Sequence, residues 1–412
     1  MTRAHPDVVI TGVALTSGLA PNAEDTWTAL LDGQTGVRPL GDALRGDIEL
    51  PTRIGAALRE HVDAELTRVE LRRLSYLQQL SLVLTRRAWQ DCGSPVVDPR
   101  RLAVSIGTGF GSGEEVIEAY IRMRAKGLKA VSPLSVQMFM PNGAAATVGL
   151  ELQAKAGVSA PMLGDASGAG AVAQAWTQIA FGDADVVICG GVESRIESVP
   201  IAAFSQLDGV LSTKDDDPGA ACRPFDRDRT GMVFGEGGAL FVMETEAHAK
   251  ARGANILARV LGSAMNSDGY DIMANDPDGE QAADAVARAI RVAGLQPGDI
   301  DHVNAHAAGT VAGDLAEAVA LRKVFGGAQP AVYAPKGALG HTFGAAGAIE
   351  AVLTAFALRD GVVPPTLNLE NLDARMELDV VAGEPRKDDY RYAVSTSFGF
   401  GGQNVALVFG KY

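Results

Sequence analysis

Two histidines and one lysine stand in surroundings typical of a chemical site. His306 follows an apolar run and enters a loop of small residues, NAHAAGTVAGD. His341 lies in PKGALGHTFGAAG, five residues after Lys336, and a further glycine-rich turn, SFGFGGQN, covers residues 397–404. Because α/β folds place ligand sites where strands open into glycine-rich loops, we expect these three segments to meet.

These residue types can stabilise a negative charge that develops during a reaction. Two neutral imidazoles donate hydrogen bonds that would hold an enolate oxygen. A nearby lysine depresses the pKa of a histidine and keeps it neutral. Lys336 would itself need an acid, such as Glu317 or Asp314 in the following helical stretch. The alternative is that Lys336 and Glu317 form a plain structural ion pair.

The elements that must position these residues alternate between short apolar runs and helical stretches rich in small residues, which is typical of an α/β protein. The pattern predicts strands over residues 7–15, 101–110, 184–192 and 254–266, and a strand that runs into a loop over 299–310. It predicts helices over residues 23–33, 68–92, 167–181, 278–295 and 312–326, and a closing hairpin over 390–410.

This alternation occurs twice in succession. We therefore expect two similar βα halves, residues 1–253 and 254–412, in one compact body, because no low-complexity linker separates them near 250–256. Residues 105–150 include SPLSVQMFMPNGAAATVG and are expected to be irregular. They are either an inserted loop packed on the core, or the lining of an apolar tunnel or a subunit interface, and methionine suits both.

Composition and charge limit the classes of molecule that the protein is expected to bind. A net charge of −14 argues against nucleic acid. The basic stretch 68–89 either docks an acidic carrier protein or is an amphipathic helix with a solvated basic face. No apolar run reaches the length of about 20 residues that spans a bilayer. Three widely spaced cysteines predict neither a disulfide framework nor a zinc site, and they fit a reducing cytoplasm.

Several long motifs in order resemble the β-ketoacyl-ACP synthases of the elongating type, over essentially the whole chain. They are VNAHAAGTVAGD, PKGALGHTFGAAGAIEA, RPFDRDRTGMVFGEGGAL and STSFGFGGQN. SPLSVQMFMPNGAAA and LDVVAGEPR are most similar to actinobacterial members that extend meromycolate precursors. The resemblance implies a thiolase-like fold with a layered αβαβα arrangement and substrates carried on the phosphopantetheine of acyl carrier protein (ACP). It implies no other cofactor and no metal, and a dimer with itself or with a cysteine-bearing synthase.

The resemblance also assigns roles to residues. In the family, two histidines help to decarboxylate malonyl-ACP, a lysine and two acids support them, two phenylalanines belong to a gating loop, and two threonines hold the pantetheine arm. The matching residues here are His306, His341, Lys336, Asp314, Glu317, Phe398, Phe400 and, for the second threonine, Thr310.

The sequence departs from the family pattern at the nucleophile. The family cysteine opens a buried helix in a motif similar to SACASGA, and the ungapped match LGDASGA places Asp165 there. The other cysteines, Cys92, Cys189 and Cys222, lie in unrelated segments and cannot replace it. Further departures are Ala307 for a glycine, Ala308 for the first threonine and Thr396 for an asparagine.

An aspartate at this position predicts altered chemistry. A carboxylate that attacks a thioester gives a mixed anhydride, which is prone to hydrolysis, so ordinary condensation is not expected; Ser167 is a second, weaker candidate nucleophile. Asp165 as a simple helix N-cap, worth about 1 kcal/mol, is the structural alternative. Its charge would also repel a malonyl carboxylate by several kcal/mol, on the order of 4 kcal/mol at 4 Å.

Three functions follow from these considerations. The preferred prediction is decarboxylation of malonyl-ACP without an acyl-cysteine, because both histidines and the lysine are present. The second is a catalytically silent partner subunit of a cysteine-bearing synthase, similar to a chain-length factor, which Asp165, Ala307 and Ala308 favour. The third makes Asp165 the base of some altered acyl-ACP reaction.

Overall fold

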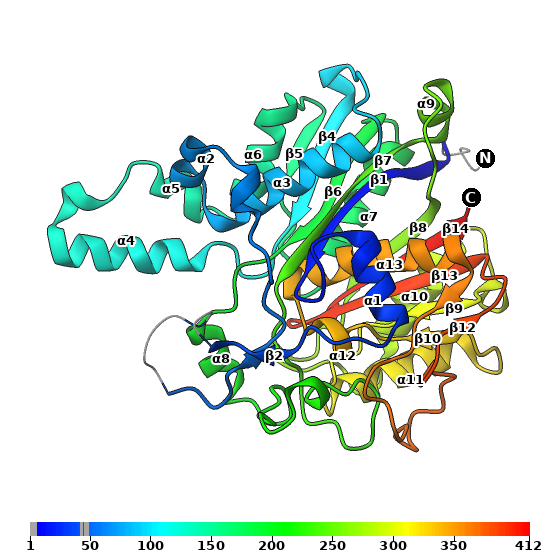
Figure 1. The fold of residues 1–412 in the computed structure, drawn as a ribbon. Coiled ribbons are helices and arrows are strands. Elements are labelled where there is room, and N and C mark those ends of the chain that lie inside the picture. The colour runs from blue at the N-terminus through cyan, green and yellow to red at the C-terminus, as the bar shows by residue number, and fades with distance from the viewer. Residues whose placement is uncertain (1–5, 42–43, 45–48) are drawn as a thin grey trace.

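One mixed β-sheet organises the molecule (Figure 1). The computed structural model describes residues 6–41, 44 and 49–412. Within these residues the sheet has ten strands, β1 (Val8–Ser17), β4 (Leu102–Gly107), β5 (Gly157–Ser159), β6 (Val186–Val192), β7 (Gly237–Thr245), β8 (Ala258–Ser267), β9 (His302–Asn304), β10 (Ala331–Tyr333), β13 (Tyr392–Gly399) and β14 (Gln403–Lys411).

The strand order is repeated in the two halves of the sheet. From the centre outward, one half runs β1-β7-β6-β4-β5 and the other runs β8-β14-β13-β9-β10. In each half the first strand lies at the centre, the last lies beside it, and the second and third form the outer edge. Strands β1 and β8 pair antiparallel across the join, through Val8–Ile10 and Ala258–Val260. The two successive βα units expected from the sequence agree with this topology, and the boundary at 253/254 stays a prediction.

Helices cover both faces of the sheet. They are α1 (Ala23–Leu31), α2 (Arg68–Arg73), α3 (Tyr76–Asp91), α4 (Gly113–Lys126), α5 (Ser135–Phe139), α6 (Gly143–Leu152), α7 (Ser167–Ala180), α8 (Ser198–Phe204), α9 (Glu246–Ala251), α10 (Glu280–Val292), α11 (Gly313–Phe325), α12 (Lys336–Leu339) and α13 (Ala346–Asp360). The short strands β2 (Arg38–Pro39) with β3 (Ile54–Gly55), and β11 (Val362–Val363) with β12 (Arg386–Lys387), form two small pairs. None of the helices in the described ranges combines the length and the apolar character that crossing a bilayer requires.

The core forms around two central helices. Helices α7 and α13 pack against each other and against strands of both halves of the sheet, while α3 and α6 cover one half and α10 and α11 cover the other. The two central helices approach closely because their sequences are rich in glycine and alanine. A Cβ on Gly347 would lie 2.7 Å from the Cβ of Ala169, a contact that real side chains avoid. This close packing brings the N-terminal end of α7 to the second half of the sheet.

Two expectations about local structure are wrong. The predicted helix over 68–92 is divided into α2 and α3, because Ser75 starts a second capping box with Gln78. The segment 105–150 is not irregular but contains α4, α5 and α6. Helix α4 has no buried residue and projects from the body as an arm (Figure 1). The strand expected to run into a loop over 299–310 is β9, and His306 lies in the loop that follows it.

Candidate active site

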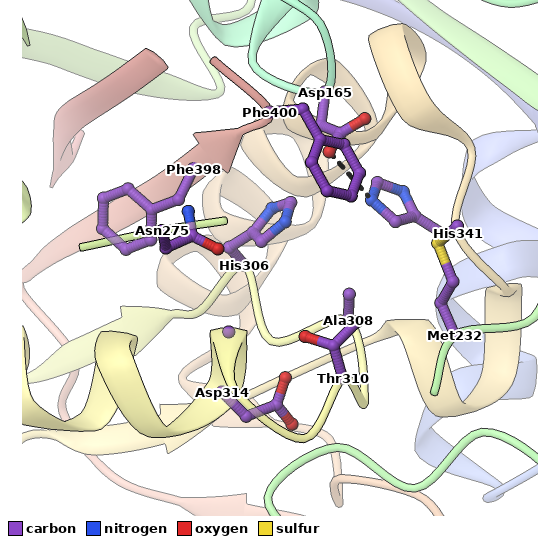
Figure 2. Close-up of a pocket in the computed structure, with 11 residues that line it drawn as sticks. Asp165, Met232, Asn275, His306, Ala308, Thr310, Asp314, His341, Phe398 and Phe400 are labelled. Carbon is purple, nitrogen blue, oxygen red and sulfur yellow. Dashed lines mark ion pairs between the residues drawn. The ribbon is translucent and has the colours of Figure 1, made fainter. Parts of the chain in front are cut away.

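Asp165 lies in the tight turn that precedes α7. The turn depends on Gly164, whose φ of +56° is in the left-handed region that favours glycine. Asp165 is only 5 % exposed. Its carboxylate does not cap α7, whose N-cap is Ala166 without a side-chain hydrogen bond, so the capping expectation is wrong. The carboxylate instead faces His341, with 3.6 Å between Oδ2 and Nε2 (Figure 2).

Contacts at Nδ1 and on the face of the ring hold His341 in one orientation. Its Nδ1 accepts a hydrogen bond from the backbone N–H of Phe343 at 3.1 Å. The neutral imidazole therefore carries its proton on Nε2, the atom that faces Asp165. The ring of Phe343 stacks on the imidazole with centroids 4.6 Å apart. Burial lowers the pKa of His341, although Asp165 acts in the opposite direction.

His306 lies beside His341, with the two ring centroids 5.3 Å apart. Its Nδ1 faces the Nζ atom of Lys336 at 3.5 Å, so its Nε2 also carries the proton of the neutral ring. Burial, and then the charge of Lys336, hold the pKa of His306 well below its ordinary value. The structure thus brings together two neutral N–H donors, as the sequence led us to expect.

Lys336 has a different acidic partner from the one expected. Its Nζ atom contacts the carboxylate of Glu350 in α13 and the backbone carbonyl of His306, and both members of the Lys336–Glu350 pair are 1 % exposed. The expectation that Glu317 or Asp314 would neutralise Lys336 is wrong. The available signal was a lone acid inside the otherwise apolar stretch AGAIEAVLTAFAL.

We expect Lys336→Met to lower the free energy of unfolding by about 3–5 kcal/mol, because it leaves Glu350 buried without its counter-charge. Chemical denaturation followed by circular dichroism measures the loss. The double variant Lys336→Met/Glu350→Gln should recover part of it, since no buried charge remains. A single variant as stable as the unaltered protein would show that the pair does not carry opposite charges.

Asp314 and Glu317 anchor the loop that carries His306. They lie in the first turns of α11, and Glu317 accepts hydrogen bonds from the backbone N–H groups of His306 (2.9 Å) and Ala307 (2.7 Å) and from the hydroxyl of Thr396 (2.7 Å). Asp314 accepts from the backbone N–H groups of Gly309 (3.0 Å) and Phe225 (2.8 Å). Burial raises the pKa of Asp314 to about 7. Both acids thus position the loop.

A pocket opens in front of the two histidines. It is lined by Asp165, Met232, Asn275, His306, Ala308, Thr310, Gly313, Asp314, His341, Phe398 and Phe400 (Figure 2). Every residue to which the resemblance gave a role lines this pocket, except Lys336 and Glu317, which lie behind it. Sequence reasoning missed Met232, although it lies in the quoted motif RPFDRDRTGMVFGEGGAL, and Asn275, which lies in no motif.

No thiol in the described ranges lines this pocket. Cys222 contacts one lining residue, with its Sγ 3.6 Å from the carbonyl of Ala308, but it is fully buried and burial raises its pKa to about 12. The hydroxyl of Ser167 is also occupied, because it hydrogen-bonds to the carbonyl of Gly164 and to the backbone N–H of Leu163. Among these groups, Asp165 is the one whose side chain lines the pocket and faces His341.

Asp165, His306 and His341 also form a set of possible metal ligands, with one ligand atom from each within 4.8 Å of the others. Both histidines, however, meet a hydrogen-bond donor at Nδ1, so their Nε2 atoms carry protons rather than free lone pairs. This arrangement favours donation to an oxygen with negative charge over coordination of a cation.

The sheet repeats its strand order, and two histidines lie side by side at the pocket. Sequence comparison identifies the family to which a chain with these features belongs. The model of the β-ketoacyl synthase N-terminal domain matches residues 5–249, and that of the C-terminal domain matches residues 257–370. The chain belongs to the β-ketoacyl synthase family. A crystal structure of a β-ketoacyl synthase from Burkholderia phymatum has a TM-score of 0.91 and 32% identity, covering 99% of this chain and 100% of that one. The predicted thiolase-like fold is confirmed.

Particular relatives are similar over their whole length. The 3-oxoacyl-[acyl-carrier-protein] synthase 2 enzymes of Mycobacterium tuberculosis and Mycobacterium leprae are 62% identical over 410 residues, which is 100% of this chain and 98% of theirs. The Staphylococcus aureus enzyme of the same name is 36% identical over 98% of both chains. The ishigamide ketosynthase/chain length factor has a TM-score of 0.90 and 27% identity, covering 99% of this chain and 100% of that one.

These relatives contradict the functions predicted from the sequence. Decarboxylation without an acyl-enzyme, a silent partner subunit and an altered reaction with Asp165 as base all assumed that condensation had been lost. The mycobacterial and staphylococcal relatives are named as synthases, that is, as ordinary condensing enzymes. The prediction was wrong because it gave the departures at Asp165, Ala307 and Ala308 more weight than the histidines, Lys336 and their supporting acids, which the structure brings together.

Proposed function

We propose that the protein is a condensing enzyme of the 3-oxoacyl-ACP synthase type. It joins an acyl group to a malonyl unit, and both substrates are thioesters of a carrier protein. The observation that carries this proposal is the 62% identity to enzymes of that name over the entire chain. The neutral N–H donors of His306 and His341 in one pocket support it.

In this proposal Asp165 takes the place of the family's nucleophilic cysteine. An oxygen of its carboxylate attacks the carbonyl carbon of the acyl thioester, the carbon–sulfur bond breaks, and the carrier thiolate leaves and takes up a proton. The product is a mixed anhydride between the acyl group and Asp165. Because Asp165 is only 5 % exposed, few water molecules reach this anhydride, which limits its hydrolysis.

The second half-reaction forms the new carbon–carbon bond. The bond between the malonyl carboxylate and its α-carbon breaks, CO₂ leaves, and the electron pair attacks the acyl carbonyl. The carbon–oxygen bond to Asp165 then breaks and restores the carboxylate. The Nε2–H groups of His306 and His341 stabilise the enolate oxygen. Acylation also removes the charge of Asp165 before the malonyl carboxylate arrives, so the repulsion expected from a free aspartate does not oppose this step.

The carrier protein is the partner proposed for this pocket. A structural neighbour, AntDE:AntF, is described as an acyl carrier protein in complex with its ketosynthase and shares 25% identity at a TM-score of 0.91, covering 99% of this chain and 100% of that one. Three exposed arginines of α2, Arg68, Arg72 and Arg73, offer an acidic carrier a basic surface. The hydroxyl of Thr310 and the amide of Asn275 line the pocket where a pantetheine arm would enter. We propose no cofactor beyond that arm.

We also propose that the protein forms a dimer through the arm. Val116, Ile117, Tyr120 and Ile121 form an apolar stripe on α4 and are 48–59 % exposed. On the body, Val158 in the edge strand β5 is 44 % exposed. A half-apolar helix that buries nothing within its own chain is stabilised when a second chain covers it.

Ile121→Glu is accordingly expected to convert a dimer into a monomer, because it places a charge within the stripe. Light scattering coupled to gel filtration measures the molar mass. Arg122→Ala, on the opposite face of the same helix, is the matched control and should remain a dimer. A dimeric Ile121→Glu variant would mean that another surface holds the two chains together.

The proposed condensation is tested by mixing the purified protein with acetyl-ACP and malonyl-ACP and following the intact carrier by mass spectrometry. The expected product is acetoacetyl-ACP. Asp165→Ala should abolish it, because no acyl acceptor remains. Conversion of malonyl-ACP only to acetyl-ACP, with no 3-oxoacyl product, would contradict the proposal.

A further inference from the structure

A buried acid directly after β6, Glu193, binds three separate turns of the chain. It is 2 % exposed and is not among the residues that line the pocket. Its carboxylate accepts hydrogen bonds from five donors, which lie in the turn after β4, in the turn after β6 and in the turn that follows His341. They are the hydroxyl of Thr108 (3.0 Å) and the backbone N–H groups of Gly109 (2.7 Å), Phe110 (3.2 Å), Ser194 (2.9 Å) and Gly344 (2.9 Å).

These contacts require a carboxylate at position 193. Four of the donors are backbone N–H groups, and the hydroxyl of Thr108 also donates, because it accepts a hydrogen bond from the N–H of Gly111 at 3.2 Å. Burial raises the pKa of Glu193, and the backbone hydrogen bonds act in the opposite direction. A carboxylate offers only acceptors, whereas an amide would turn its own donor toward at least one backbone N–H. Glutamine therefore cannot replace Glu193 without moving one of the turns.

Glu193 connects the two halves of the sheet next to His341. Glu193 and Gly109 belong to the first half, and Gly344 belongs to the second. A Cβ on Gly344 would lie 2.1 Å from the nitrogen of Gly109 and 2.8 Å from an oxygen of Glu193, so only glycine permits this approach. The turn that follows His341 is thus bound directly to the first half.

The residue between His341 and Gly344 that orients the imidazole has an unfavourable backbone conformation. Phe343 has a φ of +45°, in the left-handed region that residues other than glycine adopt only when their surroundings hold them there. Its N–H donates to Nδ1 of His341, and its ring packs between the imidazole and the ring of Phe110, with centroids 4.6 Å from each. The N–H of Gly344 belongs to the peptide unit that follows Phe343, so the bond of that N–H to Glu193 fixes the backbone of Phe343.

We propose that Glu193 is a positioning residue for the reaction. It holds Phe343 in its left-handed conformation, and Phe343 in turn keeps the proton of His341 on Nε2, facing Asp165. Glu193 acts through Gly344 and Phe343 and does not contact the substrate. The effect on the rate rests on the proposed function, because the Nε2–H group of His341 is the donor to the enolate oxygen. The effect on the imidazole itself does not depend on any reaction.

The first test reads the tautomer of His341 by nuclear magnetic resonance of the full chain labelled with ¹⁵N-histidine. Asp165→Ala is the background, because it removes the carboxylate that also favours a proton on Nε2. The signal of His341 is the one that His341→Ala removes. Adding Glu193→Gln should raise the ratio of the Nδ1–H to the Nε2–H tautomer about fivefold, the change expected when one hydrogen bond is lost.

Glu236→Gln is the matched control for this measurement. Glu236 is also buried, and it accepts hydrogen bonds from the backbone N–H groups of Leu58 (2.8 Å) and Ile196 (2.9 Å), but its side chain does not contact the turn after His341. The tautomer ratio of His341 should not change in this variant. Glu193→Asp keeps the charge with a shorter side chain, should give an intermediate ratio and replaces Glu193→Gln if that variant does not fold. An unchanged ratio in Glu193→Gln, or an equal change in Glu236→Gln, would overturn the proposal.

The second test measures condensation with Asp165 in place. Glu193→Gln should lower kcat about 10-fold, with the KM for malonyl-ACP nearly unchanged, because a misplaced donor affects the reaction more than binding. A loss confined to KM would contradict a positioning role. The tautomer is measured in a variant that is expected to form no product, so failure of the acetoacetyl-ACP assay would leave that result intact. An unchanged tautomer would overturn this inference and leave the proposed function standing.

Discussion

We expect Asp165→Cys to raise the rate of 3-oxoacyl-ACP formation by about 100-fold, which corresponds to a barrier lower by about 2.7 kcal/mol. A thiolate exchanges one thioester for another of similar energy, whereas the carboxylate must form a more energetic anhydride. The two imidazoles already lie beside position 165. The gain measures how far the natural residue slows the reaction at this site.

The gain is measured with acetyl-ACP and malonyl-ACP at saturating concentration, together with the intact mass of the protein after exposure to acetyl-ACP alone. The variant should accumulate a stable acetyl adduct that hydroxylamine removes. Cys222→Ala in the same background is the control, because the buried Cys222 lies behind the pocket wall and its loss should not change the adduct. A variant with the rate of the unaltered protein would show that acyl transfer to position 165 is not the slow step.

His306→Ala should reduce the condensation rate by roughly 100- to 1,000-fold, the usual cost of removing one donor to a developing oxyanion. The loss should be in kcat, because the Nε2–H group acts on charge that exists only during the reaction. Acyl adduct formation on Asp165→Cys/His306→Ala should persist, since that half-reaction does not pass through the malonyl enolate.

His306→Asn is the matched control, because its amide also carries an N–H donor and should recover part of the rate. Equal losses for the alanine and asparagine variants, with unchanged unfolding free energies, would show that donation is not what His306 contributes. Because Lys336 contacts both His306 and Glu350, the stability of each variant has to be measured beside its activity.

Sequence patterns predicted the helical and strand regions near the site better than the contacts between them. Helices α7, α10 and α11 lie where small-residue and amphipathic patterns placed them, and His306 and His341 meet as expected. The partner of Lys336 was missed because Glu350 comes from a helix whose orientation depends on packing between the two halves of the sheet. The division of 68–92 at Ser75 was missed because its capping box lies inside a continuous helical pattern.

The role of position 165 shows where local reasoning failed. Asp is a favoured N-cap, and the position immediately precedes a helix, yet the turn at Gly164 directs the carboxylate away from the helix toward His341. Whether the carboxylate of Asp165 caps α7 or faces His341 depends on how segments distant in the sequence pack together. The contacts of Phe343 with Phe110 and Phe204 were likewise invisible, because these residues are far apart along the chain.

The repeated strand order has a consequence for how the chain folds while it is being synthesised. Asp165 belongs to one half of the sheet and both histidines to the other, while β14, the last strand of the chain, lies between β8 and β13. The second half of the sheet therefore cannot close and face α7 until β14 has been synthesised and inserted between two strands made before it. Until then Asp165 lacks the two imidazoles that lie beside it in the folded protein, so this group of side chains is complete only after both halves of the sheet have formed.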